Sequence, residues 1–163
     1  MDIPEGAGLT LCAATPDDLP ALLDIENACF TQDRISRRSF RRFLESAGAS
    51  CILATLEGRP AGYALLLFRS GTALARLYSF AMMPQMRGRG HARALLGAAE
   101  ADAFARDRIV LRLEVREDNT PARRLYESVG YRAHGRVPNY YEDGCAALRM
   151  ETSIQASGAA SKS

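Results

Sequence analysis

The sequence predicts an α/β (α+β) fold in which helices flank a central sheet. The chain has 163 residues, of which 47% are hydrophobic and 25% charged, and this suits one soluble domain with a buried core. Its apolar patterns give the element order β-α-α-β-β-β-α-β-α-β-β. We therefore expect one domain over residues 1–154, followed by a disordered tail over 155–163 that is rich in Ser, Ala and Gly.

Composition excludes several classes of protein. The net charge of +2 is too small to predict binding to nucleic acid or to a membrane surface. The uncharged runs are too short to span a bilayer, and the opening MDIPEG lacks the features of a signal peptide, so we expect a cytoplasmic protein without membrane segments. The four cysteines form no CxxC pair and both histidines are isolated, so we expect no metal site.

The first half of the chain predicts three strands and two helices. Leu9–Ala13 is a short strand, and Thr15 caps a helix that opens at Pro16. Ser36 caps a second helix that runs to about Glu45. Two strand-like runs, 50–57 and 61–69, form a hairpin around the loop Gly58-Arg59-Pro60.

The second half predicts a strand, a long helix and then alternating elements. The expected elements are a strand over 73–83, a helix over 91–106, a strand over 108–116, a short helix from Thr120 that stops at Gly130, and strands over 131–137 and 145–152. In the strand over 108–116 the alternation places Ile109, Leu111, Leu113 and Val115 on one buried face.

The turn before the long helix is the most informative segment. It reads Arg87-Gly88-Arg89-Gly90-His91-Ala92-Arg93, and its backbone N–H groups precede a helix N-terminus. This arrangement favours a phosphate or pyrophosphate, although a plain turn with solvated arginines has the same pattern. A P-loop is excluded because no Lys-Ser/Thr pair follows, and a Rossmann fingerprint is disfavoured because position 93 is Arg.

Four short segments of the sequence resemble one known family. Arg87-x-x-Gly90-x-Ala92 matches the R/Q-x-x-G-x-G/A signature of the GNAT superfamily of acetyl-CoA-dependent N-acetyltransferases. The segments 113–119 (LEVREDN) and 125–131 (LYESVGY), with Asn139-Tyr140-Tyr141, are similar to the ribosomal-protein alanine N-acetyltransferase (RimI-like) branch. The resemblance implies a central mixed, mostly antiparallel sheet that is splayed at the acetyl-CoA site.

The resemblance also implies which residues bind acetyl-CoA. Backbone groups of the strand before the turn would pair with the pantetheine arm, the Met82 N–H would polarise the thioester carbonyl, and the turn would hold the pyrophosphate. The residues so implied are Phe80, Ala81, Met82, Arg87, Gly88, Arg89, Gly90, His91, Ala92, Arg93 and Asn119. Without the resemblance, Asn119 would be interpreted as the N-cap residue of the helix that follows it, and both roles are compatible.

Two residues are implied as catalytic. Glu114 would be the general base, since a protonated amine cannot attack a thioester, and Tyr126 would be the general acid toward the departing thiolate. Read without the resemblance, Glu114 would belong to a charged strand face that also carries Arg112 and Arg116 and would form a cross-strand ion pair, and Tyr126 would be a packing residue. Transfer is expected to be direct, because no cysteine is placed to carry the acetyl group.

The acceptor is expected to be the N-terminal α-amine of a protein, with a ribosomal protein as one candidate, and Tyr140 and Tyr141 are expected to line its groove. A small-molecule amine or a non-catalytic acyl-CoA-binding module are the alternatives. The segment 30–35 lacks the Pro-Trp typical of the RimI-like branch. The arginine cluster over 34–42 is either a solvated helix face or a surface that selects an acidic or ribosomal partner.

Overall fold

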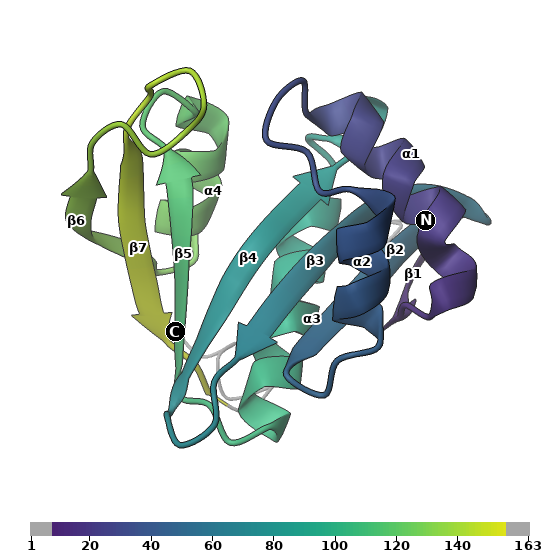
Figure 1. Ribbon diagram of the computed structural model, residues 1–163, viewed down its shortest axis with the longest axis horizontal. Coiled ribbons are helices and arrows are strands. Elements are labelled where there is room, and N and C mark those ends of the chain that lie inside the picture. The colour runs from purple at the N-terminus through teal and green to yellow at the C-terminus, as the bar shows by residue number, and fades with distance from the viewer. Residues whose placement is uncertain (1–7, 156–163) are drawn as a thin grey trace, which may run out of the picture.

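The computed structural model describes residues 8–155, which form a seven-stranded sheet with helices on both faces (Figure 1). The strands are β1 (Leu9–Ala13), β2 (Ala49–Leu56), β3 (Arg59–Phe68), β4 (Leu74–Met82), β5 (Val110–Arg116), β6 (Arg132–Val137) and β7 (Ala147–Ser153). The helices are α1 (Leu19–Cys29), α2 (Arg37–Leu44), α3 (His91–Ala105) and α4 (Thr120–Ser128). The predicted order and α/β class are confirmed; the predicted tail lies, apart from Gln155, outside the described residues.

The sheet has the order β1-β2-β3-β4-β5-β7-β6. Five of the six neighbouring pairs are antiparallel, and β4–β5 is parallel. This last pair is aligned only from Leu74–Leu77 against Val110–Leu113, although both strands continue beyond it. The sheet therefore opens into a V between β4 and β5, as the resemblance implied (Figure 1).

A β-bulge in β4 lies at the point where the V opens. Leu65 on β3 pairs with Ser79, but Leu66 pairs with Leu77, so Tyr78 is an extra residue on β4. A bulge bends its strand and increases the local twist. Since β3 continues to pair with β4 up to Met82, the bend carries the end of β4 away from β5.

Two apolar clusters hold the helices to the sheet. On one face, α1 and α2 bury Leu22, Ile25 and Phe40 against β2 and β3. On the other face, α3 lies behind the sheet and buries Leu95 and Leu96 in the larger cluster (Figure 1). Packing thus fixes both arms of the V. A separate observation is that no helix of the described residues is long and apolar enough to cross a membrane.

Several predicted boundaries are confirmed and three are corrected. Ser36 caps α2 through a bond from the Ser39 N–H, as expected. The first helix begins at Leu19, because Pro16–Asp18 form a separate 3₁₀ turn and a second proline occupies the first turn of α1. The hairpin loop is only Glu57-Gly58, whose φ angles of 52° and 82° give a tight two-residue turn that leaves the next two residues in β3.

The third correction concerns Ile109, which we predicted to be buried on the apolar face of its strand. It precedes β5 and is 55% exposed, whereas Leu111, Leu113 and Val115 are buried as expected. The reason is its position outside the strand, which begins at Val110, so the alternation that buries the later residues does not extend to it.

Candidate active site

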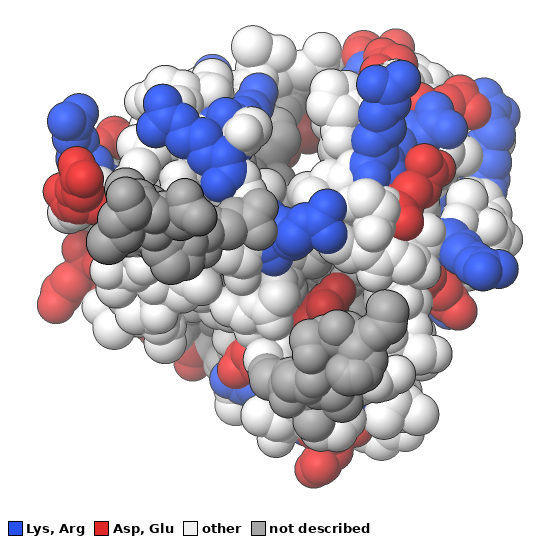
Figure 2. All heavy atoms as spheres, turned by 180° about the vertical axis from the view of Figure 1, so that it is seen from behind, with Lys and Arg blue, Asp and Glu red and all other residues white. Residues whose placement is uncertain are grey.

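The opening between β4 and β5 contains a cavity of about 1230 Å³. Its walls are the two strands, the loop between α1 and α2, the glycine-rich turn, the start of α4 and the loop between β6 and β7. Seen from behind, the molecule is hollowed at its upper edge, with basic side chains on both sides of the hollow (Figure 2). The predicted site residues that line the cavity are Phe80, Ala81, Met82, Arg87, Gly88, Gly90, Ala92, Arg93, Glu114, Asn119, Tyr126, Tyr140 and Tyr141.

The end of β4 presents backbone groups to this cavity. The Met83 N–H donates to the Ala61 carbonyl at 2.7 Å, so these two residues form a hydrogen-bonded pair of the antiparallel ladder. Hydrogen-bonded and non-hydrogen-bonded pairs alternate along an antiparallel ladder. The N–H and C=O groups of Met82 and Phe80 therefore point away from β3, toward the opening between β4 and β5. The backbone of Ala81 faces β3 instead, opposite Tyr63.

The Met82 carbonyl already has partners from two other elements. The Arg87 Nε donates to it at 2.9 Å, and the Cys29 thiol donates to it at 3.3 Å. A cysteine therefore lies in the cavity. Its position could not be predicted from sequence, because α1 and β4 are far apart in the chain. Burial raises the pKa of the Cys29 thiol, which keeps it protonated and weakly nucleophilic.

The glycine-rich turn leads directly into the long helix. Gly88 and Gly90 have φ angles of 81° and 83°, a conformation that side chains disfavour, and α3 begins at His91. The first N–H groups of a helix have no intrahelical partner, and with the helix dipole they favour an anion. The cavity reaches this helix start at Gly88, Gly90 and Ala92.

The arginines of the turn are more constrained than the sequence suggested. Arg87 is bonded to β4, and the Arg93 Nη2 donates to the Ser128 hydroxyl at 3.1 Å, which ties α3 to α4. Arg89 is exposed and, like His91, does not line the cavity. The His91 side chain points into the protein, where its Nδ1 has no partner among the described residues.

Glu114 is held by two guanidinium groups. Its side chain is 6% exposed; Oε1 accepts from Arg76 Nε at 3.0 Å and Nη2 at 2.9 Å, while Oε2 accepts from Arg149 Nε at 2.9 Å. These arginines lie on the neighbouring strands β4 and β7, so the cross-strand ion pair expected from sequence does form, whereas Arg112 and Arg116 of β5 are bonded to other acids. Oε2 retains a lone pair for a water or an amine in the cavity.

Tyr126 and Asn119 lie on α4. The Tyr126 ring is buried between Phe80 and Tyr131, with centroid separations of 6.2 and 5.6 Å. Burial raises its pKa well above the ordinary value, so the hydroxyl stays protonated and able to donate. The Asn119 side chain caps α4 by accepting from the Ala122 N–H at 3.2 Å, which confirms the N-cap prediction and leaves its amide N–H groups at the cavity wall.

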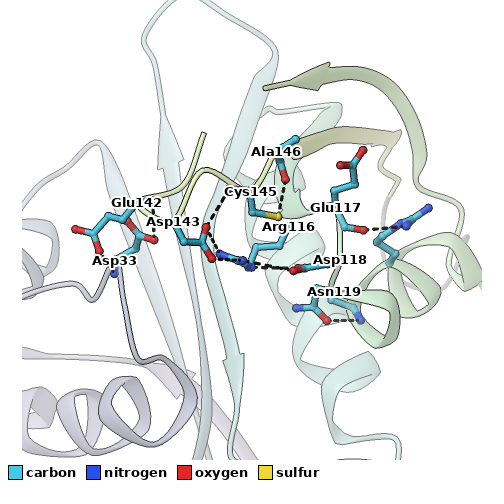
Figure 3. A network of polar contacts seen from close by, with 11 residues as sticks. Asp33, Arg116, Glu117, Asp118, Asn119, Glu142, Asp143, Cys145 and Ala146 are labelled. Atoms are coloured by element: carbon cyan, nitrogen blue, oxygen red, sulfur yellow. Dashed lines mark hydrogen bonds and ion pairs between the residues drawn. The ribbon is translucent and has the colours of Figure 1, made fainter. Parts of the chain in front are cut away.

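The two tyrosines line the wall opposite α1. The Tyr140 hydroxyl accepts from Arg76 Nη2 at 2.9 Å, and the Arg116 guanidinium lies 5.0 Å from the Tyr141 ring centre. Arg116 also bonds Asp143 at 2.7 Å and Asp118 at 3.2 Å, so one side chain fixes the β6–β7 loop against the start of α4 (Figure 3).

A contact across the mouth joins the two arms of the V. The Asp33 N–H, in the α1–α2 loop, donates to the Glu142 carboxylate at 3.1 Å, and Figure 3 shows these two side chains next to each other. The Glu142 N–H in turn lies 3.5 Å from the Asp33 carboxylate. The α1–α2 loop and the β6–β7 loop thus meet across the mouth of the cavity.

Glu26 is a cavity residue that sequence reasoning missed. It is 1% exposed, accepts from the Tyr63 hydroxyl at 2.5 Å and from the Ile35 N–H at 2.7 Å, and burial raises its pKa. It therefore ties the α1–α2 loop to the sheet. The signal was present, since position 26 lies on the same helical face as Leu22 and Cys29, where an acid is unexpected.

The open parallel pair of strands, the bulge in β4 and the glycine-rich start of α3 are features of one class of protein. The sequence model of the "Acetyltransferase (GNAT) family" matches residues 19–131, and the chain belongs to this family. As its members do, it uses acetyl-CoA as the donor. The described residues contain no group of three or more His, Cys, Asp and Glu side chains that could hold a metal ion.

Several individual proteins are similar to this chain in sequence or structure. A Bacillus subtilis protein, provisionally assigned as a [ribosomal protein bS18]-alanine N-acetyltransferase, is 30% identical over 139 residues, which cover 85% of this chain and 91% of that protein. The ribosomal-protein-S18-alanine N-acetyltransferase from Escherichia coli has a TM-score of 0.80 and 29% identity, covering 92% of this chain and 96% of the other. Ard1 from Thermoplasma volcanium has a TM-score of 0.84 and 25% identity, with coverages of 91% and 99%.

Proposed function

We propose that this acetyltransferase moves the acetyl group of acetyl-CoA to the N-terminal α-amine of a protein, within a ternary complex. The observation that carries the proposal is the continuity of one cavity from the Phe80–Met82 backbone and the α3 N-terminus to the wall of Tyr140 and Tyr141. A donor and an acceptor could therefore enter from opposite sides and meet at the end of β4. The names of the relatives at 29–30% identity support a protein acceptor.

The donor would lie along the open edge of β4. The backbone groups of Phe80 and Met82 would pair with the amides of the pantetheine arm, and the helix start at Gly88–Arg93 would receive the pyrophosphate. Because the Met82 carbonyl is bonded to Arg87, its N–H is the group left to polarise the thioester carbonyl. Asn119, at the start of α4, would contact the coenzyme on the other arm of the V.

The chemical step is then an acyl transfer between two positioned groups. The amine loses a proton to Glu114, directly or through one water at Oε2, and its nitrogen forms a bond to the acetyl carbon. The carbon–sulfur bond breaks, and Tyr126 donates its proton to the sulfur as the thiolate leaves; the second proton, which the nitrogen loses once the amide has formed, returns Tyr126 to its neutral form. Deprotonating an α-amine of pKa near 8 at pH 7 costs about 1.4 kcal/mol, against about 4.6 kcal/mol for a lysine, so a single carboxylate suits an α-amine better.

The test compares peptide acceptors that differ in the position of their free amine with small-molecule amines. Purified protein and acetyl-CoA are mixed with a peptide bearing a free N-terminus, the same peptide with a blocked N-terminus and an internal lysine, and a set of polyamines and aminoglycosides. Release of free thiol is followed, and mass spectrometry locates the acetyl group. We expect acetylation of the free N-terminus only; transfer confined to lysine or to small amines, or no transfer to any amine, would overturn the proposal.

A further inference from the structure

The helix α2 carries an unusual concentration of positive charge beside the cavity. Its eight residues, RRSFRRFL, include four arginines and no acid. Arg37, Arg38, Arg41 and Arg42 are exposed, and within the described part of the chain none of them forms an ion pair or hydrogen bond through its side chain. Arginines that only keep a surface soluble are commonly interspersed with acids, which this helix lacks.

A second, smaller cavity connects this helix to the main one. It has a volume of about 210 Å³ and lies between α2 and the bulge of β4. Asp33, Arg34, Ile35 and Tyr78 line both cavities, so the two form a continuous groove. The remaining residues of the smaller cavity are Ser36, Ser39, Arg42 and Phe43, all on or beside the flank of α2.

Helix geometry divides the four arginines into two rows. Arg42 lines the smaller cavity, and Arg38 lies one turn before it on the same flank. Arg37 and Arg41 form the other row, which the rotation of 100° per residue turns away from the cavity. Arg42 therefore lines the groove with Arg38 beside it, and Arg37 and Arg41 on the far flank offer a matched pair.

The acids near the groove do not cancel this charge. Asp33 lines the smaller cavity and Glu142 contacts Asp33 from the β6–β7 loop, and these two acids stand against Arg34, Arg38 and Arg42. In the main cavity Glu114 is paired with Arg76 and Arg149, and Glu26 is buried and hydrogen-bonded. The route out of the main cavity over α2 is therefore net positive.

We propose that this groove, lined by Arg34 and Arg42 and flanked by Arg38, binds an acidic segment of the acceptor polypeptide that follows its N-terminal residues. The inference rests on the proposed function, because an acceptor whose amine is in the main cavity must continue outward, and the smaller cavity provides a path. Charge complementarity then selects Asp and Glu in that segment and disfavours Lys and Arg. A narrow groove that ends at an amine-binding site fits a polypeptide better than RNA, and the net charge of the chain is only +2.

The experiment measures kcat/KM for three peptides with the same first two residues, followed by four acidic, four neutral or four basic residues. We expect the acidic peptide to be preferred over the neutral one, the basic peptide to be poorest, and the preference to shrink with added salt. The double variant Arg38→Gln/Arg42→Gln should reduce the preference for the acidic peptide by about three- to tenfold, as loss of two exposed ion pairs would. The control Arg37→Gln/Arg41→Gln should keep it.

The outcomes separate the two proposals. Failure to acetylate any of the three peptides overturns the proposed function itself. Equal kcat/KM for all three peptides, or equal effects of the two double variants, leaves N-terminal acetylation intact and overturns the acidic-segment inference. Competition by an RNA oligomer that depends on Arg38 and Arg42, without a preference for the acidic peptide, would also overturn it and assign the groove to nucleic acid.

Discussion

A single methyl group added at Gly62 would test how the end of β4 is positioned. Gly62 lies opposite Met82 in the sheet, and a Cβ built on it would be 2.5 Å from the Ala81 carbonyl oxygen and 3.1 Å from the Met82 Cε. The first contact involves backbone, which cannot rotate away as a side chain could. The Gly62→Ala substitution must therefore push β4 away from β3, and it is β4 that carries the Phe80 and Met82 backbone groups.

The expected loss of stability can be estimated from substitutions that add atoms to a well-packed core. Insertion of a methyl group into a well-packed core typically costs about 1–3 kcal/mol, and a displaced strand edge should weaken binding of acetyl-CoA as well. We expect Gly62→Ala to lower the free energy of unfolding by about that amount in urea titrations. We also expect a weaker acetyl-CoA affinity by calorimetry.

Gly97→Ala provides the matched control. Gly97 is exposed on α3, and a Cβ there would meet nothing within 4 Å, so the same methyl group should stabilise the helix by about 0.5–1 kcal/mol and leave acetyl-CoA binding unchanged. If Gly62→Ala were as stable as the wild type and bound acetyl-CoA equally well, the positioning of the ligand by β4 would be refuted.

The remaining predictions concern four side chains of the cavity. Glu114→Gln and Tyr126→Phe should each lower kcat by about 10²- to 10⁴-fold in steady-state assays with little change in acetyl-CoA affinity; full turnover in either variant would remove that residue from the mechanism. Cys29→Ala should retain kcat within about threefold, because the thiol is protonated and transfer is direct; complete loss of activity with normal folding would point to an acyl-enzyme. Glu26 has a pKa raised above its ordinary 4.5, so the native state binds this proton more tightly and the wild type loses stability as pH rises through that raised pKa. The difference in unfolding free energy between Glu26→Gln and the wild type should therefore shift in favour of the variant from pH 4 to pH 7, and a flat difference would show that burial does not perturb this carboxyl.

Much of the fold could be predicted from sequence because its signals are local. Ser36 before an amphipathic stretch, and Gly130 after one, mark helix ends through caps that depend on a few neighbouring residues. The alternation over residues 110–116 predicts a strand from period alone. Boundaries failed where a local rule had two solutions: Pro16 can open an α-helix or a 3₁₀ turn, and only packing of α1 decides between them.

The site was less predictable because its contacts join distant segments. The residues of the glycine-rich turn are contiguous, so a motif could point to them, although Arg89 and His91 do not line the cavity. The partners of Glu114 come from β4 and β7, and those of the Met82 carbonyl from α1 and the turn. Such pairings follow from sheet order, which a single sequence does not specify. The same holds for the contact between Asp33 and Glu142, which are 109 residues apart.

Residue-specific amide NMR of the 17.8 kDa protein during titration with acetyl-CoA tests the central claim most directly. If the thioester lies along the open edge of β4 with its pyrophosphate at the start of α3, the largest shifts will be those of the Phe80 and Met82 amides and of residues 88–93. Saturable binding with the largest shifts on other elements, or no shifts at all, would contradict the account.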